Sequence, residues 1–353
     1  MQVYVQGAWR NPETLGSLNQ ASLGESTQHA VNFIRAWNEG KSSFEFQTSG
    51  STGTPKRMTF SRRSLENSAR LTLRSLGLQP GMNALVTLDT RFVAGAMMLV
   101  RGLVGDLNLI LQEPSSHPLQ QLPGPVHFLA LVPLQLKTLL QESRQELDQV
   151  ATVIIGGAPL EDELIPWLEN MHPQFYATYG MTETLTHIAL RKLNGPGKQN
   201  AIYPLPGVHI SLDERGCLII EAGHLDTSRV VTNDLAILTP DGGFQILGRA
   251  DEVINSGGVK VHPRAVEAAT GQVLKSLSIT SRFFVAGIPD PLLHEKVCLV
   301  MEGTPLPSDT EHQLLDRLRD QLNKYELPRQ IIYRMKFAET ATQKIDKRAT
   351  LAI

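Results

Sequence analysis

The sequence predicts an α/β protein: a large N-terminal domain of α/β layers with an antiparallel β subdomain, followed by a small α+β C-terminal domain. Three observations lead to this prediction. Short apolar runs alternate with helix-like stretches between residues 83 and 179, as in a parallel sheet covered on both faces. Residues 195–248 contain shorter alternating segments broken by turn sequences, which is typical of antiparallel β structure. Residues 249–353 combine two apolar runs with an amphipathic helical stretch.

The first domain is expected to begin with a strand at residues 3–5 and a helix that includes residues 31–37. The strand-like runs that follow are residues 84–88, 107–111, 127–132, 150–155 and 175–179. The helical stretches between them are residues 94–103, 134–142 and 161–170. This order predicts β/α alternation in a single parallel sheet.

Two turn sequences mark the antiparallel part, Asp-Glu-Arg-Gly at 213–216 and Pro-Asp-Gly-Gly at 240–243. A domain boundary is expected near residue 248, which gives domains of residues 1–248 and 249–353.

The second domain should hold strands at 283–287 and 297–301 and a helix that begins near Asp309 and ends before Pro328. One face of this helix would carry Leu314, Leu315, Leu318 and Leu322.

Composition excludes several classes of protein. With 41% hydrophobic and 19% charged residues and a net charge of −2, the chain has no broad electrostatic attraction for nucleic acid or anionic membranes. Cys217 and Cys298 form neither a metal-ligand spacing nor a disulfide framework, which favours a reducing, cytoplasmic location. Residues 1–4 do not resemble a signal peptide, and the apolar residues 92–104 are too few to span a bilayer. We therefore expect no nucleic-acid or membrane partner, and the oligomeric state is not predicted.

The most informative motif is residues 48–56, Thr-Ser-Gly-Ser-Thr-Gly-Thr-Pro-Lys. Hydroxyl groups, glycine amides and the ammonium of Lys56 in one short loop favour binding of a phosphate-like anion. The Walker phosphate loop is excluded, because Gly53 is not followed by lysine and no hydroxyl residue follows Lys56. A flexible Ser/Thr/Gly linker is the alternative when these residues are considered alone.

This loop resembles the phosphate loop of the adenylate-forming (AMP-binding) superfamily of acyl-CoA ligases, adenylation domains and luciferases, and matches its T-S-G-S-T-G-x-P-K signature. The resemblance extends from residue 48 to residue 347. It implies that a carboxylic acid attacks the α-phosphate of ATP, releases pyrophosphate and is then transferred from AMP to CoA. ATP, Mg²⁺ and CoA are the implied co-substrates, and no protein nucleophile is needed. The implied phosphate-binding residues are Thr48, Ser49, Gly50, Ser51, Thr52 and Gly53, with Lys56 as a catalytic cation.

Two further motifs follow in the order that the superfamily requires. Gly156, Gly157, Ala158 and Pro159 come after a strand-like run and by resemblance lie beside adenine, although a plain strand-to-helix turn would explain them equally. Residues 179–184 read Tyr-Gly-Met-Thr-Glu-Thr and match the motif Y-G-x-T-E. By resemblance Tyr179 stacks on the adenine, Gly180 belongs to the same nucleotide-binding site, Thr182 binds the α-phosphate, and Glu183 binds magnesium. A helix start capped by Thr182 is the alternative.

The ribose is expected to bind Asp234 and Arg249, by the same resemblance. Asp234 follows an apolar β segment, and a carboxylate accepts hydrogen bonds from a vicinal diol efficiently. Asn233 stands where the superfamily usually has glycine. Taken singly, either Asp234 or Arg249 would also be explained as a partner in a surface ion pair.

Residues 248–263 resemble the segment about which the small domain of the superfamily rotates, so that the second domain is expected to be mobile. Asp251 would be the hinge residue. Gly257 and Gly258 would let the backbone approach the pantetheine chain of CoA. Lys260 would either bind CoA or lie in solvent.

Residues 343–347, Gln-Lys-Ile-Asp-Lys, occupy the position of the final motif, G-K-[IV]-x-[KR]. Lys344 is then the catalytic lysine, which stabilises the developing charge on the carboxylate and α-phosphate oxygens. Gln343 replaces the usual glycine, and a solvated basic tail is the alternative.

The acid pocket is expected at residues 91–103. The short segment before the phosphate loop and the Gly-to-Arg pattern here resemble the compact o-succinylbenzoate–CoA ligases of menaquinone synthesis. Their acid has a second carboxylate, which would be costly to bury unpaired. Arg91, Arg101 and His187 are the candidate partners, and Gly95 would leave room for the aromatic ring. Structural ion pairs are the alternative for both arginines.

Three functions therefore compete: an o-succinylbenzoate–CoA ligase, another aryl- or short-acyl-CoA ligase, and a non-catalytic nucleotide-binding homologue. The last is disfavoured because the motif residues Lys56, Glu183, Asp234, Arg249 and Lys344 are all present. A fatty acid would need no cation deep in its pocket, so neutral replacement of Arg101 separates the first two functions.

Overall fold

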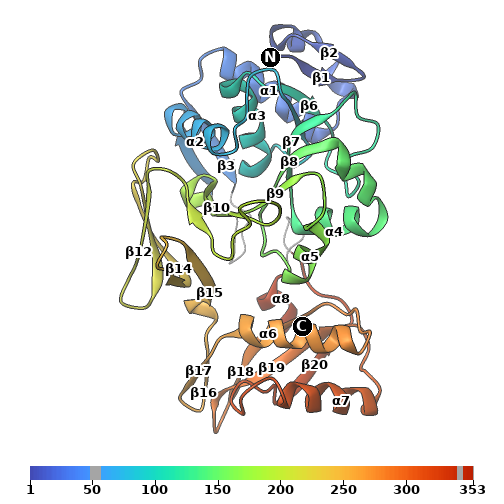
Figure 1. Ribbon diagram of the computed structural model, residues 1–353, viewed down its shortest axis with the longest axis vertical. Coiled ribbons are helices and arrows are strands. Elements are labelled where there is room, and N and C mark those ends of the chain that lie inside the picture. Colours follow the sequence, from blue (N-terminus) through green and yellow to red (C-terminus); the bar gives the residue numbers. More distant parts are fainter. Residues whose placement is uncertain (48–56, 340–344, 353) are drawn as a thin grey trace. The chain divides into compact units, whose positions relative to one another are not determined.

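The computed structural model describes residues 1–47, 57–339 and 345–352, and the chain divides into two compact units (Figure 1). The first unit comprises Met1–Ile210, Ile220–Val230 and Thr239–Gly243. The second unit comprises Ser211–Ile219, Val231–Leu238 and Phe244–Ile353. The second unit thus includes segments that precede residue 248, and the domain boundary expected there stays a prediction.

A nine-stranded sheet forms the framework of the first unit, with the strand order β11-β10-β9-β8-β7-β5-β6-β1-β2. Its five central strands are parallel, as the alternation of apolar runs predicts: β5 (Asn83–Val86), β6 (Asn108–Leu111), β7 (Val126–Leu131), β8 (Val150–Ile155) and β9 (Gln174–Gly180). The flanking strands are β1 (Val3–Val5), β2 (Ala8–Arg10), β10 (His187–Lys192) and β11 (Tyr203–Pro204). Strand β10 runs antiparallel to β9, so the chain reverses directly after β9. The predicted α/β class is confirmed.

Helices connect these strands: α1 (Glu25–Asn38), α2 (Arg62–Ser75), α3 (Val93–Gly105), α4 (Pro133–Glu142) and α5 (Ile165–Leu168). The helix expected over residues 161–170 is only partly formed, as a 3-10 turn at Asp162–Leu164 followed by the single turn of α5. Pro166 contributes to the difference, because proline lacks the amide hydrogen that would donate to the carbonyl four residues earlier, at Asp162. Helix α2 was not predicted.

Helix α3 is buried along most of its length, and every residue from 95 to 102 is buried. Its side chains Met97, Met98, Leu99 and Val100 have no exposed surface. A helix that is apolar around its circumference belongs in a core. Arg101 therefore lies where a cation is least expected.

Strands β3 (Ser43–Gln47) and β4 (Arg57–Ser61), which lie on either side of residues 48–56 in the sequence, pair antiparallel, with Gln47 opposite Arg57. Phe33 of α1 packs against Phe44 of β3, with ring centroids 4.6 Å apart. Aromatic packing of this kind anchors the strand pair to α1.

The antiparallel segments expected at 195–248 form a four-stranded sheet with the order β12-β13-β14-β15. These strands are β12 (Val208–Leu212), β13 (Cys217–Ala222), β14 (Arg229–Leu238) and β15 (Phe244–Arg249). The turn predicted at 213–216 is confirmed by a hydrogen bond from the amide of Gly216 to the carbonyl of Asp213.

A five-stranded sheet forms the core of the second unit, with the order β17-β16-β19-β18 and β20 paired to β19. The strands are β16 (Ile254–Ser256), β17 (Val259–Val261), β18 (Phe283–Asp290), β19 (His294–Glu302) and β20 (Gln330–Arg334). The helices are α6 (Pro263–Ser276), α7 (Ser308–Arg319) and α8 (Lys347–Ala352), and in Figure 1 α6 and α7 run alongside the strands. The predicted strands are present, and Leu314 and Leu318 of the predicted amphipathic helix are buried against the sheet. The helix is shorter than expected, because it ends at Arg319 and Leu322 lies beyond it. Among the described residues, no helix is long and apolar enough to cross a membrane.

Candidate active site

Two predicted nucleotide-binding motifs lie at the same edge of the nine-stranded sheet. Residues 156–159 follow β8 and residues 181–184 follow β9, and the two strands are parallel neighbours with Ile155 paired to Ala177. Their carboxyl ends therefore meet, which is where open α/β sheets bind ligands. Gly157, Ala158 and Pro159 are exposed there.

The local structure also explains why residues 156 and 157 are glycines. A side chain at Gly156 would come within 2.2 Å of the Thr178 hydroxyl oxygen, and Gly157 has a φ of +85°. Both conditions favour glycine without any ligand. The role of residues 156–159 beside adenine stays a prediction.

The turn between β9 and β10 carries Thr182 and Glu183. Gly180 pairs with His187, and a Cβ atom at Gly180 would approach the Thr186 carbonyl oxygen to 2.3 Å. Residues Thr182–Thr184 form one 3-10 turn, after which the chain enters β10. The helix start that offered an alternative explanation of Thr182 is therefore not formed.

Glu183 suits a magnesium ion that arrives with a nucleotide. Its side chain is exposed, and no residue in the described ranges pairs with its carboxylate. Within those ranges there is also no group of three His, Cys, Asp or Glu side chains that could hold a metal by itself. Mg²⁺ is commonly bound by one or two carboxylates together with phosphate oxygens and water, and this donor set fits that pattern.

Arg101 is a buried cation without a counter-ion among the described residues. Its side chain is 2% exposed and donates to the Thr186 hydroxyl at 3.1 Å, while its other contacts are His187 Nδ1 at 3.5 Å and Met98 Sδ at 3.7 Å. Its Nε has no hydrogen-bond partner in the described part of the chain. Burial lowers the pKa of Arg101 to about 9, so the guanidinium is still charged at neutral pH.

His187 lies against Arg101 as a neutral side chain. Burial, and secondarily the charge of Arg101, hold the pKa of His187 well below its usual range. Its Nε2 lies 3.2 Å from the Thr72 hydroxyl. Arg101, His187 and the hydroxyls of Thr72 and Thr186 thus form a cluster with one positive charge, which we call the Arg101 cluster. Such a cluster favours an anion.

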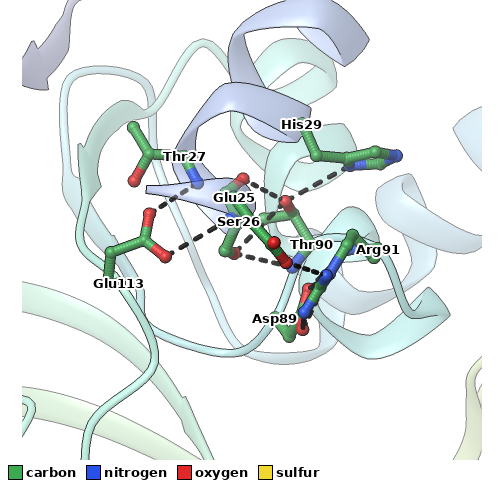
Figure 2. Close-up of polar contacts among 8 residues, drawn as sticks. All are labelled: Glu25, Ser26, Thr27, His29, Asp89, Thr90, Arg91 and Glu113. Atoms are coloured by element: carbon green, nitrogen blue, oxygen red, sulfur yellow. Dashed lines mark hydrogen bonds and ion pairs between the residues drawn. The ribbon is translucent and has the colours of Figure 1, made fainter. Parts of the chain in front are cut away.

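Arg91 has a different environment, which Figure 2 shows. It binds the carboxylates of Asp89, at 2.7 Å, and Glu25, so its charge is compensated within the protein. In the same group the Thr90 amide donates to the Ser26 hydroxyl at 3.0 Å and the Thr90 hydroxyl donates to the Ser26 carbonyl at 2.6 Å. These bonds join the start of α1 to the segment before α3. The structural ion pair that was the alternative for Arg91 is therefore present, and its role toward an acid stays a prediction.

Gly95 also has a structural explanation. A Cβ atom at this position would approach the carbonyl oxygens of Asp89 and Leu88 to 2.4 Å and 2.6 Å. The space that a side chain would need is filled by backbone, so the glycine allows α3 to pack and does not by itself leave room for a ring.

The predicted ribose-binding residues are brought together in the second unit. Asp234 and Arg249 are paired across β14 and β15, with Arg249 Nη1 3.5 Å from Asp234 Oδ1. Arg249 also donates twice to Asp251 at 2.9 Å, and this contact lowers the pKa of Asp251. Asn233, which stands where glycine is usual, accepts from Arg215 at 3.1 Å. One arginine therefore links the expected ribose carboxylate to the expected hinge residue.

Gly257 and Gly258 form the two-residue connection of the β16–β17 hairpin, with φ of +61° and +81°. A hairpin of this type needs positive φ at both positions, which explains the two glycines. Lys260 is exposed on β17. Of the remaining predicted site residues, Tyr179 lies on β9 and pairs with Ala189 of β10. The others lie outside the described ranges: Thr48, Ser49, Gly50, Ser51, Thr52, Gly53, Lys56 and Lys344.

Three threonines that contact this region were not among the site residues predicted from the sequence. Thr72 and Thr186 contact the Arg101 cluster through pairings that span 115 and 85 residues, so no local pattern could reveal them. Thr184 has a weak signal, because it directly follows the Y-G-x-T-E motif.

Comparison with known proteins identifies the family of the chain. A family model described as AMP-binding enzyme matches residues 41–223, just over half of the chain. The chain belongs to the AMP-binding enzyme family. The expected superfamily, and with it the expectation of an AMP-forming ligase, is thereby confirmed.

Individual members of the AMP-binding enzyme family show how far the similarity extends. An acyl-CoA synthetase (AMP-forming)/AMP-acid ligase II-like protein from Dyadobacter fermentans is 38% identical with a TM-score of 0.64, over 97% of this chain and 98% of that one. A 2-succinylbenzoate–CoA ligase from Listeria monocytogenes is 23% identical over 94% of this chain and 74% of its own length. The O-succinylbenzoate coenzyme A synthetase from Bacillus subtilis, in complex with ATP and magnesium, has a TM-score of 0.72 at 20% identity, covering 87% and 69%. At that identity the likeness concerns the fold alone.

Proposed function

We propose that this protein is an acid–CoA ligase whose acid carries a second carboxylate, with o-succinylbenzoate as the candidate substrate. The observation that carries the proposal is the buried guanidinium of Arg101, which has no carboxylate partner among the described residues. A buried charge without a counter-ion costs several kcal/mol, on the order of the stability of a whole domain. A substrate carboxylate would offset this cost on binding.

The position of the Arg101 cluster supports the same substrate class. Arg101 donates to Thr186, three residues beyond Glu183, so a carboxylate at Arg101 would lie close to the turn expected at the α-phosphate. A dicarboxylic acid could then place one carboxylate at the reacting phosphate and the other at Arg101. The neutral His187 would add a hydrogen-bonding group without a second charge.

The other predicted site residues would each serve one part of a two-step reaction. In the first step a substrate carboxylate oxygen attacks the α-phosphorus of ATP, and pyrophosphate leaves. In the second the CoA thiol attacks the acyl carbon, loses its proton, and AMP leaves. Mg²⁺, when bound at Glu183, supplies charge neutralisation on the phosphates. Thr182 would bind the α-phosphate, Asp234 and Arg249 the ribose, and Lys56 and Lys344 the developing charge.

The names of several relatives support this assignment, including the 2-succinylbenzoate–CoA ligases from Listeria monocytogenes and Lactococcus lactis. Such a substrate would place the protein in menaquinone synthesis, in the cytoplasm. A monocarboxylic aryl or short acyl acid is the second candidate, and would leave Arg101 without a partner in the complex.

The test measures pyrophosphate release with ATP and Mg²⁺ for o-succinylbenzoate, benzoate and a medium-chain fatty acid, with and without CoA. We expect turnover with o-succinylbenzoate and consumption of CoA. The variant Arg101→Met, which keeps an apolar side chain, should raise the KM for o-succinylbenzoate about 10- to 150-fold, since removing a charge-assisted hydrogen bond costs roughly 1.5–3 kcal/mol.

Arg91→Met is the matched control, because it removes an arginine whose charge is already balanced by Asp89 and Glu25. It should change the KM less than threefold, as expected of an exposed pair. Preference for benzoate or a fatty acid would keep the ligase and refute the dicarboxylate. Binding of ATP without pyrophosphate release for any acid would favour the non-catalytic alternative.

A further inference from the structure

The turn between β9 and β10 is strained at one residue. Leu185 has φ of +64° and ψ of −54°, and the amide of Thr186 donates to the carbonyl of Thr184 at 2.7 Å. These values describe a γ-turn with positive φ, which is rare and costly for a residue with a branched side chain. The Leu185 side chain is fully buried. Such a conformation persists only when its surroundings hold it.

The Thr184 hydroxyl holds the two ends of this turn together. It accepts from the amide of Met181 at 3.0 Å, and its proton faces the carbonyl oxygens of Met181 at 3.0 Å and Thr186 at 2.8 Å. Thr184 has no exposed surface, so water does not compete for these bonds. One buried hydroxyl therefore links residue 181, before the 3-10 turn, to residue 186, after the γ-turn.

Neighbouring elements close the same turn from outside. Arg101 of α3 donates to the Thr186 hydroxyl at 3.1 Å. At the other end Gly180 leaves no room between its backbone and that of Thr186 and His187. Thr182 and Glu183 lie between the residues that these contacts hold, and the Glu183 side chain is exposed.

We propose that Thr184 is a positioning residue, which holds the Thr182 hydroxyl and the Glu183 carboxylate in the geometry that Mg²⁺ and the nucleotide phosphates require. This inference rests on the proposed function of those two residues. Thr184 acts through the backbone of the turn. The strained backbone of Leu185 indicates that surrounding contacts hold the turn in a conformation that it would not adopt by itself. A group held this way does not have to be ordered when the nucleotide binds.

The test compares Thr184→Val, which has the same shape without the hydroxyl, with Thr184→Ser, which keeps it. Removing a residue that orients a metal ligand typically costs about 10- to 100-fold in metal affinity or activity. For Thr184→Val we expect the half-saturating Mg²⁺ concentration for pyrophosphate release to rise by about this factor, with an unchanged KM for the acid. Hydrogen exchange of the Met181 amide, measured without ligand, should accelerate, and Thr184→Ser should restore both properties.

Thr270→Val is the control for loss of a buried hydroxyl. Thr270 is equally inaccessible, and its hydroxyl donates to the Val266 carbonyl within α6 at 2.7 Å. It should lower the melting temperature without changing the Mg²⁺ dependence.

Two outcomes would overturn the inference, and they are distinguishable. A wild-type enzyme that is active, with Thr184→Val unchanged in Mg²⁺ dependence and affected only in melting temperature, would show that Thr184 serves stability alone. A wild-type protein that neither binds Mg·ATP nor releases pyrophosphate would refute the proposed function, and this inference with it.

Discussion

At the scale of single residues, the Arg101 cluster predicts how stability depends on pH. His187 is buried, and its pKa lies well below its usual value of about 6.5. Below that pH the imidazole is protonated in the unfolded chain but stays neutral in the folded chain. Because the unfolded state then binds more protons, stability is lost as the pH falls below about 6.5.

The variant His187→Gln should remove this contribution, and the difference between variant and wild type isolates it from the other histidines. One proton changes stability by at most about 1.4 kcal/mol per pH unit. Thermal melts between pH 5 and pH 8 measure the effect. Parallel pH profiles for the two proteins would contradict a neutral, buried His187.

At the scale of elements, variants in the β16–β17 hairpin can distinguish a role of Gly258 in folding from a role in binding CoA. Gly258 has a φ of +81° and open space where a Cβ would lie, so Gly258→Ala adds conformational strain without a collision. We expect it to destabilise the second unit by about 1–2 kcal/mol, and Gly258→Asn by less, because asparagine tolerates positive φ. Urea denaturation measures both, with Gly124→Ala, at a glycine without positive φ and equally open, as the control.

The same pair of variants tests the role toward CoA. If the hairpin backbone approaches the pantetheine chain, Gly258→Asn should impair transfer of the acyl group to CoA while pyrophosphate release persists. Equal rates of transfer in Gly258→Asn and wild type would leave the two glycines with a folding role only.

Elements differ in how far their sequences determine them. The parallel strands were predictable because strands buried on both faces need continuous apolar runs, and the turns because Asp and Gly have specific backbone preferences. Helix α2 was missed because its segment is rich in charged residues and only Ser64, Leu65, Ser68, Ala69, Thr72 and Leu73 are buried.

Contacts at the site were less predictable than the elements that carry it. Arg91 pairs with Glu25, 66 residues away, and His187 pairs with Thr72, 115 residues away. Because these partners are so far apart in the sequence, the sequence does not show which arginine has its charge compensated by carboxylates. The two arginines of one segment therefore looked equivalent until the tertiary structure gave Arg91 two carboxylates and Arg101 none among the described residues.

At the scale of the whole molecule, the two-step chemistry predicts that the half-reactions depend on different residues. Lys344, expected at the carboxylate and α-phosphate, should matter for adenylate formation, and losing one such preorganised donor typically costs about 10²–10³ in rate. Lys344→Ala should therefore release pyrophosphate at least about 100-fold more slowly, yet transfer a supplied acyl-adenylate to CoA at close to the wild-type rate.

Lys324→Ala is the control for this experiment, since it removes an exposed lysine of the second unit that no motif includes. It should leave both half-reactions unchanged. Gly258→Asn, which is expected to impair only the transfer to CoA, provides the opposite pattern. If Lys344→Ala slowed both half-reactions by the same factor, Lys344 would have to act on a state common to both, and rotation of the second domain about Asp251 would no longer be needed to explain the order of the two steps.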